Sequence, residues 1–353
     1  MLSSLLLIRK SWVVFIYAIT ISIESIIIEY LTTSTSFLRV SPIMLSAISI
    51  ISAGAMLLMV AAFVFKKKNE ITILFANSWK NLTLASLSLS LGIFTWYDSI
   101  SRIGASKEVL IAGPVEIVVI VVLARVFLNE RLNRFHIIGI SVALIGFFMA
   151  VASDINFDVG VNIETVKITQ PALSTSSLSD IITFGDGEAI LSAFGFAIGV
   201  LFLSKLLLKH SSIGVAGASM LVSGLILVGF MILGLLLPNE SDHASSSPNK
   251  VSLLPQPLII AIIILFLFSV IPFIGSLSYS IGLSRIGASL TATIGSSSIL
   301  ITVILQMVLK ELGVTSHLPQ NILLAILGGV IGFLGIYVIH MYDYYIPMKK
   351  REL

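Results

Sequence analysis

Long apolar stretches separated by short polar ones form the main pattern along the chain, and many of them run for about 20 residues. A helix of about 20 residues spans the roughly 30 Å of a bilayer core. The pattern therefore predicts an all-α membrane protein with ten transmembrane helices, at residues 11–30, 41–65, 82–103, 106–128, 135–153, 188–208, 212–237, 258–283, 288–309 and 319–341. Two polar stretches, 154–187 and 238–257, interrupt the series.

The hexapeptide SRIGAS occurs twice, at Ser101–Ser106 and at Ser284–Ser289, and a long apolar stretch follows each copy. Such internal similarity indicates two related halves. We predict a first five-helix repeat at residues 1–153, an external polar loop at 154–187, and a second five-helix repeat with a cytoplasmic tail at 188–353. Because five is odd, the second repeat crosses the membrane in the opposite direction. An inverted repeat of this kind is the architecture that alternating access requires.

The composition also indicates a membrane protein and excludes several other classes. The chain has 353 residues, of which 57% are hydrophobic and only 11% charged, and a soluble core cannot hide that much apolar surface. The absence of cysteine excludes disulfides, thiolate metal sites and cysteine nucleophiles. No zinc-protease, serine-hydrolase or phosphate-binding motif is present, so we expect no enzyme, no cofactor and no metal. The net charge of +3 does not indicate nucleic-acid binding, since the basic residues lie near the ends of the predicted helices.

Lysine and arginine are distributed unequally between the two sides of the predicted bilayer. The side that holds both termini has fourteen of them, including the runs Lys66–Lys68 and Lys349–Arg351, whereas the other side has six. Basic residues are enriched on the cytoplasmic side of membrane proteins. We therefore predict a multi-pass protein of the cell membrane with both termini in the cytoplasm.

Several features recur in a fixed order along the chain: the SRIGAS hinge, Pro114 in the middle of an apolar helix, the charged step Asn129-Glu130-Arg131, and a helix punctuated by glycines. In this order the chain resembles the ten-helix EamA-type members of the drug/metabolite transporter superfamily over nearly its whole length. The second half departs from the pattern, because Ser297 stands in place of Pro114 and Lys310-Glu311 lacks the following arginine.

The resemblance implies a solute carrier whose central cavity is lined mainly by helices 1, 3, 4, 6, 8 and 9. It does not identify the substrate, because the family carries amino acids, drugs, sugars, nucleotide-linked compounds and other metabolites. Our hypothesis is a secondary active transporter that exports a small metabolite or drug-like solute by alternating access with proton coupling, as a monomer or a homodimer. The alternatives are a channel or lipid translocator of the same fold, and a membrane scaffold that transports nothing.

Glu116 lies near the middle of the predicted helix at 106–128, where a charged side chain is costly and indicates function. Glu108, Ala112 and Glu116 follow one another at intervals of four residues and therefore share one helix face. Pro114 removes one backbone hydrogen bond and weakens the helix beside this carboxyl group. We predict that Glu116 binds substrate or protons. The alternative is a glutamate that bonds to a neighbouring helix for structure alone.

Two further carboxylates are candidates for the same cavity. Glu24 ends the stretch YAITISIE, which is similar to the first helix of the small multidrug resistance family, where a glutamate binds protons and cationic substrate in turn. Asp98 follows Trp96 and Tyr97, and aromatic rings with a carboxylate form cation-binding pockets. Tyr279 stands at the position of Trp96 in the second repeat. The alternatives are that Glu24 reaches water at the outer rim and that the aromatic residues form an interfacial belt.

The remaining polar and small residues of the predicted helices have two interpretations each. Lys107-Glu108 is expected to be the solvated start of a helix. Ser298, within a run of three serines, and Gln306 either contact the substrate or pack between helices. Small residues four apart favour close helix packing, at Gly195/Gly199 and at Gly328/Gly332. An acidic cavity would favour cationic or zwitterionic substrates.

Overall fold

The computed structural model describes residues 2–33, 40–128, 134–153, 183–236, 258–312 and 321–349, and every regular element in these ranges is a helix. The first half contains α1 (Leu2–Thr33), α2 (Pro42–Met59), the π-helical turn η1 (Val60–Val64), α3 (Lys68–Asn77), α4 (Trp79–Ile103), α5 (Ala105–Leu128) and α6 (Arg134–Ala152). The second half contains α8 (Phe184–Leu207), α9 (Ser212–Leu236), α10 (Leu258–Phe268), α11 (Val270–Ile286), α12 (Ala288–Gly295), α13 (Ser297–Glu311) and α14 (Ile322–Lys349). Of the predicted polar stretches at 154–187 and 238–257, residues 154–182 and 238–257 lie outside the described residues, whereas residues 184–187 belong to α8.

Helices occupy all ten predicted spans, which confirms the predicted all-α membrane fold. Within the described ranges, five helical segments are long and apolar enough to cross a bilayer by length and hydropathy alone: Trp12–Thr33, Pro42–Val64, Phe184–Leu207, Ser212–Gly234 and Ile263–Ile286. Two shorter apolar helices, Ile137–Ala152 and Ile322–Gly335, accompany them.

Two of the predicted spans are broken, where the sequence predicted continuous helices. The eighth span is interrupted at Ser269, between α10 and α11. Pro272 has no N–H to donate to the carbonyl of Phe268, so the helix cannot continue there with its regular bonds. The ninth span is interrupted at Ser296, between α12 and α13. The Ser297 hydroxyl donates to the carbonyl of Ile294 at 2.7 Å, and such local bonds compete with the helical ladder.

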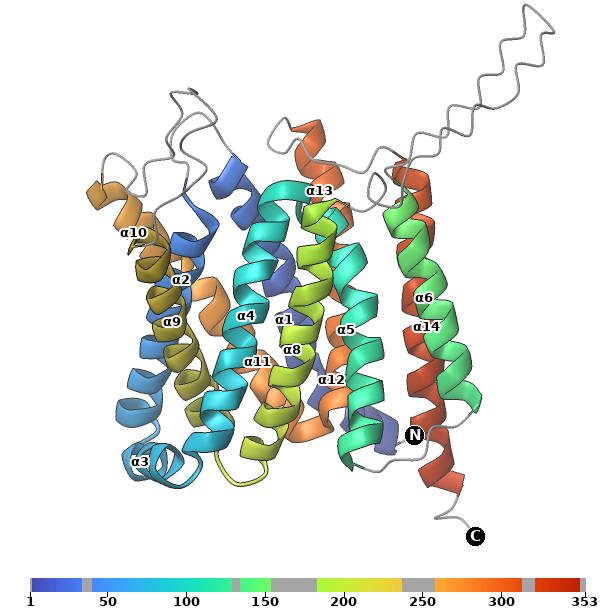
Figure 1. Cartoon of the computed structure of the whole chain (residues 1–353). Coiled ribbons are helices and arrows are strands. Elements are labelled where there is room, and N and C mark those ends of the chain that lie inside the picture. Colours follow the sequence, from blue (N-terminus) through green and yellow to red (C-terminus); the bar gives the residue numbers. More distant parts are fainter. Residues whose placement is uncertain are drawn as a thin grey trace, which may run out of the picture.

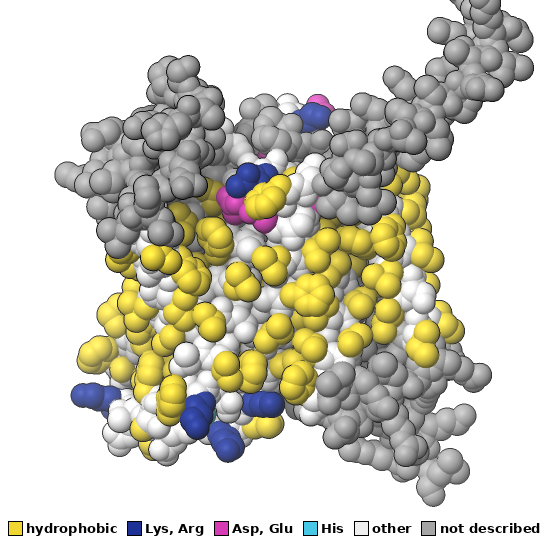
Figure 2. Space-filling model, viewed as in Figure 1, with side chains coloured by type: hydrophobic (Ala, Val, Ile, Leu, Met, Phe, Trp, Pro, Cys, Tyr) yellow, Lys and Arg dark blue, Asp and Glu magenta, His cyan; other side chains and the backbone are white. Residues whose placement is uncertain are grey.

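The spans cross the bundle in alternating directions (Figure 1), so that α1 begins and α14 ends at the same, lower end of the molecule. Side chains of Lys66–Lys68, Lys80, Lys205 and Lys209 belong to the ends of helices on this lower face. Figure 2 shows a broad band of hydrophobic side chains on the visible face, with Lys and Arg gathered below it. A band of apolar side chains bounded by charge is the surface that a bilayer requires.

The helices pair as two inverted repeats predict. α1 packs against α11 and α4 packs against α8, and these two pairs exchange when the first and second repeats are exchanged. α2 packs on α9 and α6 packs on α14, and each of these pairs maps onto itself. The four helices α1, α4, α8 and α11 therefore surround a centre that both repeats share.

The two SRIGAS segments have the same backbone conformation. Gly104 joins α4 to α5 with φ 82° and ψ 161°, and Gly287 joins α11 to α12 with φ 83° and ψ 172°. This region of the backbone map is accessible in practice only to glycine. The glycine of the hexapeptide therefore fixes the angle at which the fourth helix of each repeat leaves the third.

The short helix α3, which the hydrophobic pattern did not predict, lies at the lower end (Figure 1). The Glu70 carboxylate accepts a hydrogen bond from the Ser211 backbone N–H and pairs with Lys67 at 3.2 Å. Burial tends to raise the pKa of Glu70, but these bonds outweigh it and hold that pKa below its usual value. Ser78 bonds to the His210 ring at 2.9 Å. α3 is thus fastened to the connection between α8 and α9.

Close helix contacts occur at the predicted small-residue positions, and the packing role expected of them is confirmed. A Cβ at Gly195 would lie 2.6 Å from the backbone of Gly92, at the crossing of α8 and α4. A Cβ at Gly328 would lie 2.7 Å from the Gly146 carbonyl, at the crossing of α14 and α6. Backbones that approach this closely leave no room for any side chain.

Candidate functional site

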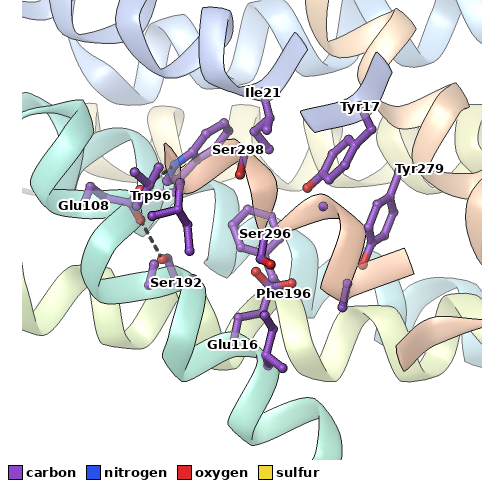
Figure 3. A pocket seen from close by; sticks show the side chains of 17 residues that line it. Tyr17, Ile21, Trp96, Glu108, Glu116, Ser192, Phe196, Tyr279, Ser296 and Ser298 are labelled. Carbon is purple, nitrogen blue, oxygen red and sulfur yellow. Dashed lines mark hydrogen bonds between the residues drawn. The ribbon is translucent and has the colours of Figure 1, made fainter. Parts of the chain in front are cut away.

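A cavity lies at the centre of the bundle, where α1, α4, α5, α8 and α11 meet the break between α12 and α13. It consists of two hollows of about 660 and 740 Å³, counted with the part that is open to solvent. The hollows share six lining residues, which are Tyr17, Ile21, Trp96, Glu116, Phe196 and Tyr279 (Figure 3). The spans predicted to line the cavity, which are the first, third, fourth, sixth, eighth and ninth along the chain, all contribute to the lining. Residues of α2 and α9, the second and seventh spans, contribute as well.

Glu116 lines both hollows. Glu108, Ala112 and Glu116 all face the first hollow, which confirms that they share one face of α5. Among the described residues, the Glu116 carboxylate has no hydrogen bond and no ion pair. The alternative interpretation, in which Glu116 bonds to a neighbouring helix for structure alone, therefore finds no such bond in the described part of the chain. α5 continues through Pro114, whose ring lies against Gly332 of α14. The proline thus packs away from the cavity that Glu116 faces.

Glu24 lines the second hollow from α1 and is 4% exposed. Its Oε1 accepts a hydrogen bond from the Tyr97 hydroxyl at 2.8 Å, and that hydroxyl lies 3.3 Å from the Ser49 oxygen. Tyr97 is fully buried behind the cavity wall. Glu24 therefore does not reach out to water at the rim, and it shares one cavity with Glu116.

Four aromatic rings enclose the space around Glu116. Tyr17 and Tyr279 lie with ring centroids 4.6 Å apart, and Trp96 and Phe196 with centroids 5.9 Å apart. The first pair joins α1 to α11 and the second joins α4 to α8, so the repeats contribute related pairs. Trp96 and Tyr279, predicted as equivalent positions, both line the cavity. They are not an interfacial belt.

The prediction that Lys107 and Glu108 form the solvated start of the fourth span is wrong, because these residues are only 4% and 1% exposed. Glu108 accepts hydrogen bonds from the Trp96 indole N–H at 3.0 Å and from the Ser192 hydroxyl at 3.4 Å. Lys107 pairs with Asp186 at 2.9 Å. The reason is that α8 begins at Phe184, four residues before the predicted start of its span, and its first turn covers the start of α5.

Asp98 is not among the residues that line either hollow. It forms an ion pair with Arg102 at 2.9 Å, one turn along α4, and Arg102 also contacts Glu188 of α8 at 3.1 Å. Arg102 further lies over the Phe184 ring. Asp98 is thus part of a charged cluster at the upper end of the bundle, separate from the carboxylates of the cavity.

Gln306 and Ser298, both on α13, occupy different environments. Ser298 lines the first hollow, and its carbonyl accepts a hydrogen bond from Ser22. Gln306 lies outside the lining and donates to the Glu29 carboxylate at 2.6 Å. Its own carbonyl accepts the Ser106 backbone N–H, while Glu29 accepts that of Ala105. These bonds satisfy the first N–H groups of α5, which a helix leaves unpaired.

The match to known proteins follows the same two repeats. A family model described as the EamA-like transporter family matches residues 10–152 and residues 183–341. The chain belongs to the EamA-like transporter family. It is therefore a multi-pass membrane transporter of the drug/metabolite type.

Solved structures support the fold of this EamA-like protein. Twenty-two solved chains match this one, and one of them, titled "Crystal structure of protein", has a TM-score of 0.57 at 13% sequence identity. The alignment covers 95% of this chain and 99% of that one. At this identity the likeness concerns the fold alone. No curated protein matches the chain.

The polar groups at the upper end of the cavity of this EamA-like transporter form what we call the upper polar layer. It is composed of Glu29, Asp98, Arg102, Lys107, Glu108, Asp186, Glu188 and Gln306, and Glu108 also lines the first hollow. It joins the upper ends of α1, α4, α5, α8 and α13. By the offset between the SRIGAS copies, Asp98, Lys107 and Glu108 correspond to Ile281, Leu290 and Thr291 in the second repeat, whereas Arg102 corresponds to Arg285. Of these four charged positions, the second repeat therefore retains only the arginine. Glu29 and Asp186 carried no sequence signal, because their partners lie far away along the chain.

Replacing Lys107 with methionine is expected to lower the stability by about 3–5 kcal/mol, because Asp186 would remain as a buried charge without its partner. The double variant Lys107→Met with Asp186→Asn should regain most of this loss, since the asparagine can still cap α8. Thermal unfolding of the purified protein in detergent measures both. A single variant as stable as the wild type would show that this pair does not hold α8 over α5.

Proposed function

We propose that this protein is a secondary active transporter that exports a small metabolite or drug-like solute by alternating access, in exchange for protons. The observation that carries this is the Glu116 carboxylate, which faces the central cavity and has no partner among the described residues. A carboxyl group in this position can hold a proton or a substrate group in turn, and ionisable groups inside membranes mark such pathways.

The asymmetry of the cavity supports alternating access. The upper polar layer joins five helices above the cavity, whereas the positions of the second repeat equivalent to Asp98, Lys107 and Glu108 are uncharged. To close the cavity at its lower end instead, the two repeats would have to exchange conformations about the shared centre, which inverted repeats permit. We place the upper end outside the cell and both termini in the cytoplasm, because Lys and Arg gather at the lower end (Figure 2).

A reconstituted system separates this proposal from its alternatives. Protein in liposomes with an internal pH-sensitive dye is exposed to a panel of solutes, and a labelled solute is then followed with and without unlabelled solute on the opposite side. A proton-coupled carrier gives saturable flux that moves protons and is stimulated by solute on the far side. Flux without such stimulation would favour a channel. A labelled phospholipid that changes leaflet without solute flux would favour a lipid translocator, and no flux of any kind a scaffold.

A further inference from the structure

The described residues that line the cavity include acidic side chains and no basic ones. Three carboxylates face the two hollows, those of Glu24, Glu108 and Glu116, and no Lys, Arg or His of the described part of the chain is among the lining residues. Two cations of the upper polar layer are engaged elsewhere, since Lys107 pairs with Asp186 and Arg102 with Asp98. A ligand that carries a carboxylate or phosphate would meet acidic side chains and no basic side chain among the described lining residues, so its charge would be desolvated without a cationic partner.

The three carboxylates differ in their remaining capacity for a ligand. Glu24 accepts a hydrogen bond from Tyr97, and Glu108 accepts bonds from Trp96 and Ser192. Glu116 accepts none from the described residues, and its carboxylate lies between the hollows that it lines. One carboxylate is therefore open to a ligand, which matches a single positive charge.

The surroundings of Glu116 suit the body of an organic cation. The Tyr17–Tyr279 and Trp96–Phe196 pairs present ring surfaces to the same space (Figure 3). Ring faces attract ammonium groups, and the attraction strengthens when the cation is desolvated. The Tyr279 hydroxyl is buried and has no hydrogen-bond partner among the described residues, so it offers a second polar contact in the cavity.

We propose that the cavity selects an organic monocation, with its ammonium group on Glu116 and its apolar body between the two aromatic pairs. For the movement of this cation across the membrane the inference rests on the proposed transport function, whereas the binding preference does not. Anions are excluded by charge. Zwitterions such as amino acids are disfavoured because no side chain in the described lining carries a positive charge for their carboxylate.

The test uses three probes that share one phenyl body and differ in charge. At neutral pH 2-phenylethylamine is a cation, phenylalanine a zwitterion and 3-phenylpropionate an anion. Equilibrium binding to the purified wild-type protein is measured by calorimetry for each. The cation should bind at least about tenfold more tightly than either of the others, since a hydrogen bond to a charged group contributes on the order of a tenfold to hundredfold gain. Equal or tighter binding of phenylalanine or phenylpropionate, or binding of none of the three, overturns the inference.

Two matched variants test whether the Glu116 carboxylate is the negative charge that selects the cation. Glu116→Gln keeps the size of the side chain and should abolish the preference for the cation over the zwitterion. Glu311→Gln, on the exposed end of α13, removes one carboxylate outside the cavity and should leave the preference unchanged. A preference that survives Glu116→Gln contradicts the assignment of the charge to Glu116. Because the comparison of the three probes is made first on the wild type, it does not depend on the folding of a variant.

Binding and transport can fail separately. Selective binding of the cation with no proton movement in liposomes supports this inference and contradicts the proposed function. Proton-coupled flux of an anion or a zwitterion, without binding of the cation, supports the proposed function and overturns the inference. Binding and proton-coupled flux of the cation support both.

Discussion

Replacing Glu116 with glutamine is expected to lower proton-coupled flux by about 100-fold, and to remove its dependence on the pH gradient. Glutamine cannot bind and release a proton at the pH values of the assay. In addition, the loss of a charged hydrogen-bond partner costs on the order of 1.5–3 kcal/mol, or about one to two decades in rate or affinity. The fold should survive, since the carboxylate makes no contact with the described residues that glutamine would break. Flux therefore fails for a chemical reason and not because the protein unfolds.

The measurement is the initial rate of solute-driven proton movement in liposomes at several external pH values. Glu24→Gln is the informative comparison, because Glu24 lines the same cavity but already accepts a bond from Tyr97. It should reduce the rate less than Glu116→Gln does. Glu311→Gln serves as the control outside the cavity. If Glu116→Gln and Glu24→Gln both kept the pH dependence of the wild type, proton coupling through these carboxylates would be ruled out.

The position of Glu116 in the cavity could be predicted because it depends on local information. Its depth in an apolar helix and its spacing from Glu108 and Ala112 are properties of one segment, and a helix fixes which side chains share a face. The repeat and the ten spans follow for the same reason, from periodicity and from two copies of one hexapeptide. The resemblance to a transporter family then indicated which helices surround the centre.

What could not be predicted depends on contacts between distant segments. Glu108 appeared to begin a solvated helix, and only the approach of α8, with Asp186 in its first turn, buries it. Asp98 was assigned to the cavity for its aromatic neighbours, although Arg102 follows at the spacing of an ion pair on one helix face. This four-residue spacing can be read from the sequence, and it favours the ion pair between Asp98 and Arg102 that the structure shows. The break at Ser296 carries no proline, so its cause lies in side-chain bonds that compete with the backbone.

The contact between α6 and α14 gives the second large expected effect. Replacing Gly146 with valine should lower the stability by about 3 kcal/mol or more, since overpacking a tight contact forces backbone shifts. A Cβ at Gly146 would lie 2.3 Å from the Gly332 nitrogen and 2.5 Å from the Gly328 carbonyl oxygen. These are backbone atoms, which cannot rotate away as a side chain can. The two helices would have to separate along their contact.

Gly229 of α9 provides the matched control, because a Cβ there would meet nothing within 4 Å. Gly229→Val should change the stability by less than about 0.5 kcal/mol, as substitutions away from packed contacts do. Thermal unfolding in the same detergent compares the two variants. Equal stability of Gly146→Val and Gly229→Val would contradict the close approach of α6 and α14. Because lipid tails solvate separated helices as well as packed ones, close backbone approach is what holds such a pair together in the membrane. Pro114 of α5 lies against Gly332 in the same contact, so a forced separation of α14 should also reach the helix that carries Glu116.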